Sequence, residues 1–175
     1  MRRIVTGHNE AGQSIIEIDG GPAAEISANG SGLHEIWLTE SVPADNTVLA
    51  DALAGASPTL CPPEGGVKVR WFTVPVADPN ASAEETEAAV ALGFASVGAA
   101  HCRVDTLRHP AMHKTASVDY IILIEGEVDL LLDAGEAKAL KSGDVVIQRG
   151  TNHAWVNTGS KPALLVAVLA DATPV

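Results

Sequence analysis

Polar side chains that can bind a metal ion or a proton precede an apolar run in the second half of the chain. His113, Thr115 and Asp119 occupy odd-numbered positions, as do Ile121 and Leu123 of the run "IILI". Alternate side chains of an unbroken strand point to one face. We therefore expect His113, Thr115 and Asp119 to point into the protein interior, at the open end of the apolar core.

A second group of this kind follows the glycine-containing turn "QRGTN". His153, Trp155 and Asn157 fall on one face of the next expected strand. If the two strands are neighbours, His113, Asp119 and His153 meet around one space. Two imidazoles and one carboxylate would then surround that space, with Trp155 as an apolar wall.

The two segments resemble the two sequence motifs of the cupin family. The first motif has the form His-x-His, then three or four residues, Glu, and six residues before Gly. The second runs from Gly-Asp through a short strand and a Pro-x-Gly turn to His-x-x-x-Asn. Here "HKTASVDYIILIEG" and "GDVVIQRGTNHAWVN" stand in these places. The matching positions are His113, Thr115, Asp119 and Gly126 in the first motif and Gly143, Asp144, Gly150, His153 and Asn157 in the second.

The sequence departs from the cupin motifs in four ways. Thr115 replaces the second histidine, Asp119 replaces the glutamate, the turn has no proline, and the second motif is one residue shorter before its histidine. The residues of the two motifs also resemble those of a bacterial and fungal group of small single-domain cupins. Most members of that group have no assigned reaction.

The resemblance implies an all-β fold: a cupin barrel, or double-stranded β-helix (jelly roll), with extra N-terminal strands and one short helix. We place N-terminal strands and a Pro- and Gly-rich loop in residues 1–66, and the cupin barrel in residues 67–175. The two parts are expected to form one structural domain overall, which suits a chain of 175 residues.

The resemblance also implies a metal site. A full cupin site has three histidines and one glutamate, which leaves His113, Asp119 and His153 as metal ligands here. Such a set suits non-haem Fe(II), and Mn, Zn or Ni would also accept it, so one divalent transition metal is the expected cofactor. Asp119 is one methylene shorter than glutamate, which leaves open that it orients a ligating histidine instead. A polar mouth that binds a ligand or waters without metal is the alternative.

Five further side chains are candidates for contact with a substrate: Thr115, Trp155, His101, His109 and Arg149. Thr115 can hold a bound water, Trp155 can form a wall of the cavity, and Arg149 can pair with a substrate carboxylate. His101 has the parity of an inward-facing strand residue, and His109 lies on a loop at the mouth. A purely structural role is the alternative for most of these residues. Trp155 would then be a core residue, His101 and His109 would lie at the rim, and Arg149 would be a surface residue.

Turn residues divide the N-terminal half. A hairpin is expected from residues 2–5 and 13–18, and a third strand at 33–40. The segment Ser41–Gly66 is rich in Pro, Ala and Gly and is expected to be mostly loop. An alternating strand follows at 67–76. Its one face carries Val67, Val69 and Trp71, and its other face carries Lys68 and Arg70.

One helix is expected over residues 80–94. Ser82 and Glu85 form a capping box, and Gly93 is expected to end the helix. We expect a connecting helix on the outside of a sheet, with a lid over the pocket as the alternative. Turns at regular spacing then separate expected strands at residues 95–107, 117–126, 127–133, 136–141, 144–148, 153–157 and 163–170.

Net charge limits the expected partners. The 22 acidic and 11 basic residues give a formal charge of −11, which argues against nucleic acid and anionic membranes because both attract a basic surface. No stretch approaches the roughly 20 apolar residues that span a bilayer, and a polar segment follows "MRRIV" where a signal peptide would be apolar. We expect a cytoplasmic protein with Cys61 and Cys102 as free thiols, a disulfide being left open.

These observations favour a metal-dependent enzyme that acts on a small apolar or aromatic, oxygenated molecule, either dioxygenase-like or a lyase or isomerase. A metal-free cupin that binds a small molecule without catalysis is the alternative, and a mainly structural barrel is a third hypothesis. Homodimerisation is expected because a strand at residues 34–40 would form an exposed sheet edge.

Overall fold

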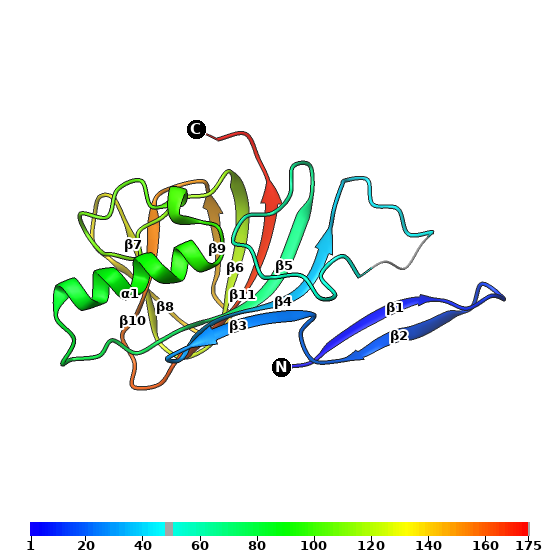
Figure 1. Ribbon diagram of the computed structural model, residues 1–175, viewed down its shortest axis with the longest axis horizontal. Helices are drawn as coiled ribbons and strands as arrows, with labels where there is room; N and C mark the ends of the chain where they lie inside the picture. The colour runs from blue at the N-terminus through cyan, green and yellow to red at the C-terminus, as the bar shows by residue number, and fades with distance from the viewer. Residues whose placement is uncertain (48–50, 175) are drawn as a thin grey trace.

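A computed structural model describes residues 1–47 and 51–174 of the chain (Figure 1). In chain order its elements are β1 (Arg3–His8), β2 (Ser14–Gly20), β3 (Ala24–Ala28), β4 (Ser31–Thr39), β5 (Val67–Val74), α1 (Ala83–Ser96), the 3-10 helix η1 (Ala100–Cys102), β6 (Ser117–Glu125), β7 (Val128–Leu132), β8 (Lys138–Leu140), β9 (Val145–Arg149), β10 (His153–Asn157) and β11 (Ala163–Asp171).

Two antiparallel sheets enclose the core. The larger sheet has the strand order β3-β4-β5-β11-β6-β9, and the smaller has the order β10-β7-β8. Side chains from both meet in one apolar cluster, with Leu123 and Leu165 from the larger sheet and Val128 and Trp155 from the smaller. The predicted all-β barrel with extra N-terminal strands and one α-helix is confirmed.

Strict alternation of side chains builds the two central strands. In β6, Ser117, Asp119, Ile121 and Leu123 are buried, and in β11 every second residue from Ala163 is buried. Because successive side chains of a strand point to opposite faces, the buried set is the one that faces the barrel interior. Full burial of a leucine in this set stabilises the fold by roughly 1.5–3 kcal/mol.

Charged side chains, and not the valines, occupy the inner face of β5. Lys68 and Arg70 are 3% and 1% exposed, whereas Val67, Val69 and Trp71 on the opposite face are only half-buried. The alternation expected from the sequence is therefore present, but its basic face is the one that points into the barrel.

Glu35 of β4 explains this orientation. It lies opposite Arg70 in the β4–β5 pair and is fully buried. Arg70 Nη2 is 3.1 Å from Glu35 Oε1 and donates a hydrogen bond of 2.6 Å to the carbonyl oxygen of Thr59. Burial raises the pKa of the Glu35 carboxyl and lowers the pKa of Lys68 to about 8. Buried charges persist only with buried partners, so this pairing overrides the apolar pattern.

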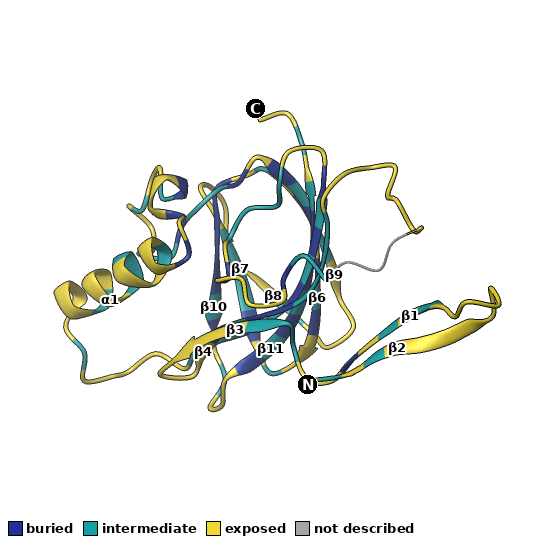
Figure 2. Ribbon diagram, turned by 45° about the vertical axis from the view of Figure 1, so that its right-hand side comes forward, coloured by how far each residue is buried: buried dark blue, intermediate teal, exposed yellow. Residues whose placement is uncertain are grey.

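Helix α1 lies on the outside of the barrel, and none of its residues is buried (Figure 2). The predicted capping box is present: Glu85 N donates to Ser82 Oγ at 3.1 Å, and Ser82 N donates to the Glu85 carboxylate at 2.8 Å. The helix continues past Gly93. It ends before Gly98, whose φ of 68° is left-handed and whose N–H donates to the Ala95 carbonyl oxygen at 3.1 Å.

The expected strand at residues 95–107 is wrong. Its first two residues belong to α1, and Ala100–Cys102 form η1. The glycine at 98 turns the chain, and no strand pairing follows until β6 apart from an isolated bridge at His113. His101 is therefore not an inward-facing strand residue, contrary to the expectation from its parity, and lies exposed on η1.

The strand expected at residues 33–40 is confirmed as β4, but its expected position at a sheet edge is wrong. Strand β4 pairs with β3 on one side and with β5 on the other. The sequence pattern did not predict β3. The larger sheet instead has β3 and β9 at its edges. The predicted N-terminal hairpin is confirmed as β1 and β2, which form a separate two-stranded sheet that projects from the barrel (Figure 1).

The predicted loop over Ser41–Gly66 contains no helix or strand in its described residues, and residues 48–50 lie outside them. No helix in the described ranges is long and apolar enough to cross a membrane. Since β3 and β4 join the larger sheet through β5, the division of the chain at residue 66 stays a prediction.

Candidate functional site

His113 and His153 face each other in an antiparallel bridge. Each backbone N–H donates to the carbonyl oxygen of the other residue at 2.9 Å, and the ring centroids are 4.4 Å apart. His153 begins β10 of the smaller sheet, whereas β6 of the larger sheet begins only at Ser117. The chain thus crosses between the sheets after His113. The histidine pair arises from this crossing and not from one continuous strand.

Both imidazoles have the same tautomer. Nδ1 of His113 donates to the carbonyl oxygen of Ala111 at 2.9 Å, and Nδ1 of His153 donates to that of Thr151 at 3.0 Å. Because a carbonyl oxygen only accepts, Nδ1 carries the proton and Nε2 of the neutral ring keeps its lone pair.

Burial keeps both rings neutral. It lowers the pKa of His113, and it lowers the pKa of His153 to about 3, with a further contribution from the neighbouring His113. Two neutral imidazoles with anchored Nδ1 atoms are typical of metal-ligating histidines, because the backbone hydrogen bond orients the ring. The pair therefore fits a divalent metal.

Asp119 faces the interior from the larger sheet. Its side chain is almost fully buried, and within the described structure its Oδ1 has no hydrogen-bond partner. Burial raises the pKa of this carboxyl to about 6, and the Ser117 hydroxyl, the Arg70 charge and the Thr115 hydroxyl partly oppose the rise. A buried carboxyl oxygen without a partner is costly unless a ligand, an ion or a water completes it.

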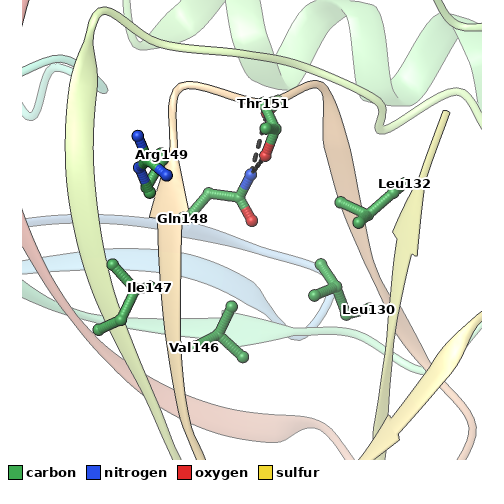
Figure 3. A pocket seen from close by; sticks show the side chains of 7 residues that line it. All are labelled: Leu130, Leu132, Val146, Ile147, Gln148, Arg149 and Thr151. Carbon is green, nitrogen blue, oxygen red and sulfur yellow. Dashed lines mark hydrogen bonds between the residues drawn. The ribbon is translucent and has the colours of Figure 1, made fainter.

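A pocket of about 400 Å³ lies between β7 and β9 (Figure 3). Leu132 is opposite His153 in the β7–β10 pair, and Gln148 is opposite Asp119 in the β6–β9 pair. Opposite residues of an antiparallel pair share a face, so the pocket connects the histidine side of the barrel with the carboxylate side. The residues that line it are Leu130, Leu132, Val146, Ile147, Gln148, Arg149 and Thr151.

Of the predicted substrate-side residues, Trp155 and Arg149 lie at or near this space, whereas Thr115 lines a second pocket. Thr115 is buried, with its hydroxyl 2.7 Å from that of Ser117. Trp155 is almost buried and stands edge-on to the His153 ring at 5.2 Å between centroids. Arg149 is exposed on the outer face of β9 and points away from Gln148, so it reaches only the pocket rim (Figure 3).

The other two predicted residues lie outside this pocket. His109 is half-buried in the loop before His113, where its Nδ1 accepts a hydrogen bond from Ala111 N at 3.1 Å. His101 is exposed on η1, with Nε2 3.5 Å from Cys102 Sγ. Neither histidine lines the space between β7 and β9.

Asp119 does not close a ready-made triad with the two histidines. Donor atoms of one ion lie at most about 4.6 Å apart, since each bond is about 2.3 Å or shorter. Within the described ranges, the group of three or more His, Cys, Asp or Glu residues whose donor atoms all lie within 4.8 Å is Cys61, His101 and Cys102. The histidine pair thus fits a metal, while Asp119 stands apart from it.

Gln148 and Arg70 are buried polar residues near the candidate site that the sequence pattern did not single out. Gln148 is buried and shares the inner face of β9 with Val146, so the alternation of "VVIQ" was a sufficient signal. Arg70 is buried with Nε and Nη1 unpartnered in the described structure. Its inward orientation depends on Glu35, which lies on another strand, and no local pattern indicates that.

The C-terminal half of the chain matches a known family model. Residues 104–169 match the family model of the cupin domain. Together with the two-sheet barrel, this match supports a small cupin 2 barrel domain in this part of the chain.

Similar proteins carry names from biosynthesis and redox chemistry. Phomopsin biosynthesis cluster protein C' of Diaporthe leptostromiformis is 28% identical over 99% of this chain and 79% of its own length. The cupin-domain-containing oxidoreductase virC of Hypocrea virens is 43% identical over 37% of this chain and 34% of its own length. A solved cupin 2 conserved barrel domain protein from Salinispora arenicola is 16% identical over 83% of this chain and 79% of its own, with a TM-score of 0.41. A structural likeness at this level bears on neither site nor activity.

Proposed function

We propose that this cupin is a metal-dependent enzyme that acts on a small, largely apolar or aromatic, oxygenated molecule inside the barrel. The observation that carries the proposal is the pair of neutral imidazoles, His113 and His153, with anchored Nδ1 atoms, free Nε2 lone pairs and centroids 4.4 Å apart. They would hold one divalent transition metal, Fe(II), Mn, Zn or Ni. When bound, such an ion polarises a substrate oxygen or, as Fe(II), activates dioxygen.

The side chains of the pocket would bind the substrate. Leu130, Leu132 and Val146 offer apolar surface for a carbon skeleton and exclude water from it. Gln148 Nε2 donates to the carbonyl oxygen of Thr151 at 3.0 Å, and its own amide oxygen is turned toward the pocket (Figure 3). That oxygen can accept a hydrogen bond from a substrate hydroxyl.

Asp119 is the proposed proton acceptor. It lies opposite Gln148 in the larger sheet, whereas His153 belongs to the smaller sheet. A carboxyl with a pKa of about 6 is mostly ionised at neutral pH. In this proposal Asp119→Asn keeps the metal and loses turnover by about 100-fold or more. Loss of the metal in that variant would instead make Asp119 the third ligand, as the sequence predicts.

The names of two relatives support one reaction class within this proposal. Relatives named as an oxidoreductase and as a biosynthesis cluster protein favour an oxidation over a lyase or isomerase reaction. The alternative, ligand binding without catalysis, is favoured by the unpartnered polar atoms of Arg70 and Asp119, which a polar ligand would satisfy without any metal.

Elemental analysis of untagged protein tests the metal site. The measurement uses a Cys102→Ser background, so that the cysteine cluster contributes no metal. About one transition metal per chain is expected, and both His113→Ala and His153→Ala should lose it. His109→Ala, which removes a half-buried histidine outside the pocket, is the matched control and should retain it. A metal-free parent after anaerobic reconstitution would leave the ligand-binding alternative.

A second copy of this chain is the proposed protein partner. The outer face of β6 and β9 carries a contiguous apolar patch, because Tyr120 is opposite Ile147 and Ile122 is opposite Val145. Tyr120, Val145 and Ile147 are 44%, 57% and 49% exposed, and β9 is an edge strand. A patch of this kind beside a sheet edge favours a two-fold dimer.

A further inference from the structure

Cys61, His101 and Cys102 form a side-chain cluster whose residues do not line the pocket between β7 and β9. Cys61 lies in the loop between β4 and β5, and the other two residues belong to η1. The two sulfur atoms are 3.8 Å apart, and His101 Nε2 is 3.5 Å from Cys102 Sγ. Both cysteines are free thiols.

These two distances match the separations between ligand atoms around a tetrahedrally coordinated metal ion. With Zn–S bonds of about 2.3 Å and a Zn–N bond of about 2.0 Å, tetrahedral geometry separates two sulfurs by about 3.8 Å and a sulfur from a nitrogen by about 3.5 Å. A disulfide would instead require the sulfurs to lie about 2.05 Å apart. The two observed separations match the tetrahedral values, and the donor atoms of all three residues lie within 4.8 Å of one another, so the spacing suits three ligands around one ion.

The backbone holds the three residues in place without any ion. Leu60 N donates to the Val97 carbonyl oxygen at 3.1 Å, which fixes the loop beside the end of α1. Cys102 N donates to the Ala99 carbonyl oxygen at 2.9 Å, and the Cys102 carbonyl oxygen accepts from Lys114 N at 3.0 Å. A site assembled in advance loses little conformational freedom when it binds its ion.

A second pocket, of about 370 Å³, opens onto the cluster. Besides the three residues, it is lined by Lys114, Thr115 and Asp171 among others. The Asp171 carboxylate already accepts a hydrogen bond from Gly65 N at 2.8 Å. The three clustered residues therefore line solvent-accessible space.

We propose that Cys61, His101 and Cys102 bind one Zn²⁺ ion whose fourth coordination position opens into this second pocket. Three protein ligands with one open position are the arrangement of reactive zinc sites, whereas structural sites are closed by a fourth residue. A water, or an oxygen or nitrogen donor of a small molecule, occupies the open position. The site is separate from the histidine pair and shares no ligand with it.

Metal binding in a His113→Ala/His153→Ala background tests the ligand set. This background still binds about one Zn²⁺ per chain in a chelator-competition titration, and the further changes Cys61→Ser or His101→Ala abolish it. His8→Ala, an exposed histidine of β1, is the matched control and leaves binding unchanged. Equal zinc binding with and without Cys61→Ser would overturn the proposal.

Cobalt substitution in the reduced wild-type protein gives an independent readout. Co²⁺ bound by the two thiolates produces sulfur-to-metal charge-transfer absorption in the near ultraviolet, which His and Asp ligands do not produce. The band disappears in Cys61→Ser and persists in His113→Ala. Added azide shifts the visible bands, because it enters the open position. Absence of the charge-transfer band, a Cys61–Cys102 disulfide that persists under reductant, or bands insensitive to azide would overturn the proposal.

Discussion

Glu35, Lys68 and Arg70 place three charges on the inner face of the larger sheet, where apolar side chains would be expected. Lys68 Nζ donates to the carbonyl and hydroxyl oxygens of Thr59 at 2.8 and 2.6 Å and lies 3.9 Å from Glu35 Oε1. Each cation is thus tied to the loop before β5 as well as to Glu35. At this scale the stability of the barrel depends on one anion that serves two cations.

Removing that anion should be strongly destabilising. Glu35→Gln leaves Lys68 and Arg70 buried without a counter-charge, which is expected to lower the free energy of unfolding by about 3–5 kcal/mol. Urea denaturation measures this change in the free energy of unfolding. Glu25→Gln, whose side chain is 61% exposed, is the control and should change stability by about 0.5 kcal/mol or less. A Glu35→Gln protein as stable as the control would contradict the account of the cluster.

Lys68 should make stability depend on pH. Its pKa is about 8 in the folded protein against 10.5 in the unfolded chain. Between these values the unfolded chain binds more protons, so folding stability rises with pH. Comparison of wild type with Lys68→Met, which cannot titrate, at about pH 7 and about pH 9.5 should show a relative gain for wild type of about 1–3 kcal/mol. No gain would mean that the ammonium is not desolvated.

At the scale of elements, tight turns decide how strands reach the site. Gly126, between β6 and β7, has a φ of 102°, and a Cβ built there would lie 2.7 Å from the Cα of Ala163. The turn therefore needs both the left-handed conformation and the missing side chain. It connects the strand that carries Asp119 with the strand that lines the pocket.

Gly126→Ala is expected to cost about 2–4 kcal/mol of unfolding free energy, because backbone strain and a clash with β11 add together. Gly135→Ala separates the two effects: its φ is 82°, but a Cβ there meets nothing within 4 Å. That variant should lose only about 1–2 kcal/mol. Thermal unfolding of the pair checks the difference, and equal losses would show that the contact with Ala163 relaxes freely.

At the scale of the whole molecule, the apolar patch on the outer face of β6 and β9 predicts a dimer. Ile147→Lys puts a charge at the centre of that face and is expected to shift the dimer dissociation constant by about 100-fold or more. Leu92→Lys, at a side chain 72% exposed on α1, should leave it unchanged. Analytical ultracentrifugation distinguishes the species, and a wild-type monomer at micromolar concentration would refute the dimer.

Several parts of the fold are readable in the sequence because their causes are local. The alternation of β6 and β11 follows from the period of the strand, and the capping box of α1 from residues three apart. Strand alternation predicted that His113, Asp119 and His153 would meet, and the two histidines do. The strand expected at 95–107 was wrong because Gly98 adopts a left-handed φ, which an apolar run does not reveal.

The sequence by itself determined the barrel class, the central strands, and the presence of imidazole and carboxylate groups at the barrel interior. Tertiary structure alone decided which groups meet. The bridge between His113 and His153 brings the two rings together, while Asp119 belongs to the larger sheet. The pairing of Arg70 with Glu35 turns a basic face inward, and the packing of a loop against η1 joins Cys61 to Cys102. Such contacts depend on residues distant in the chain, whose free energy of pairing outweighs the local pattern.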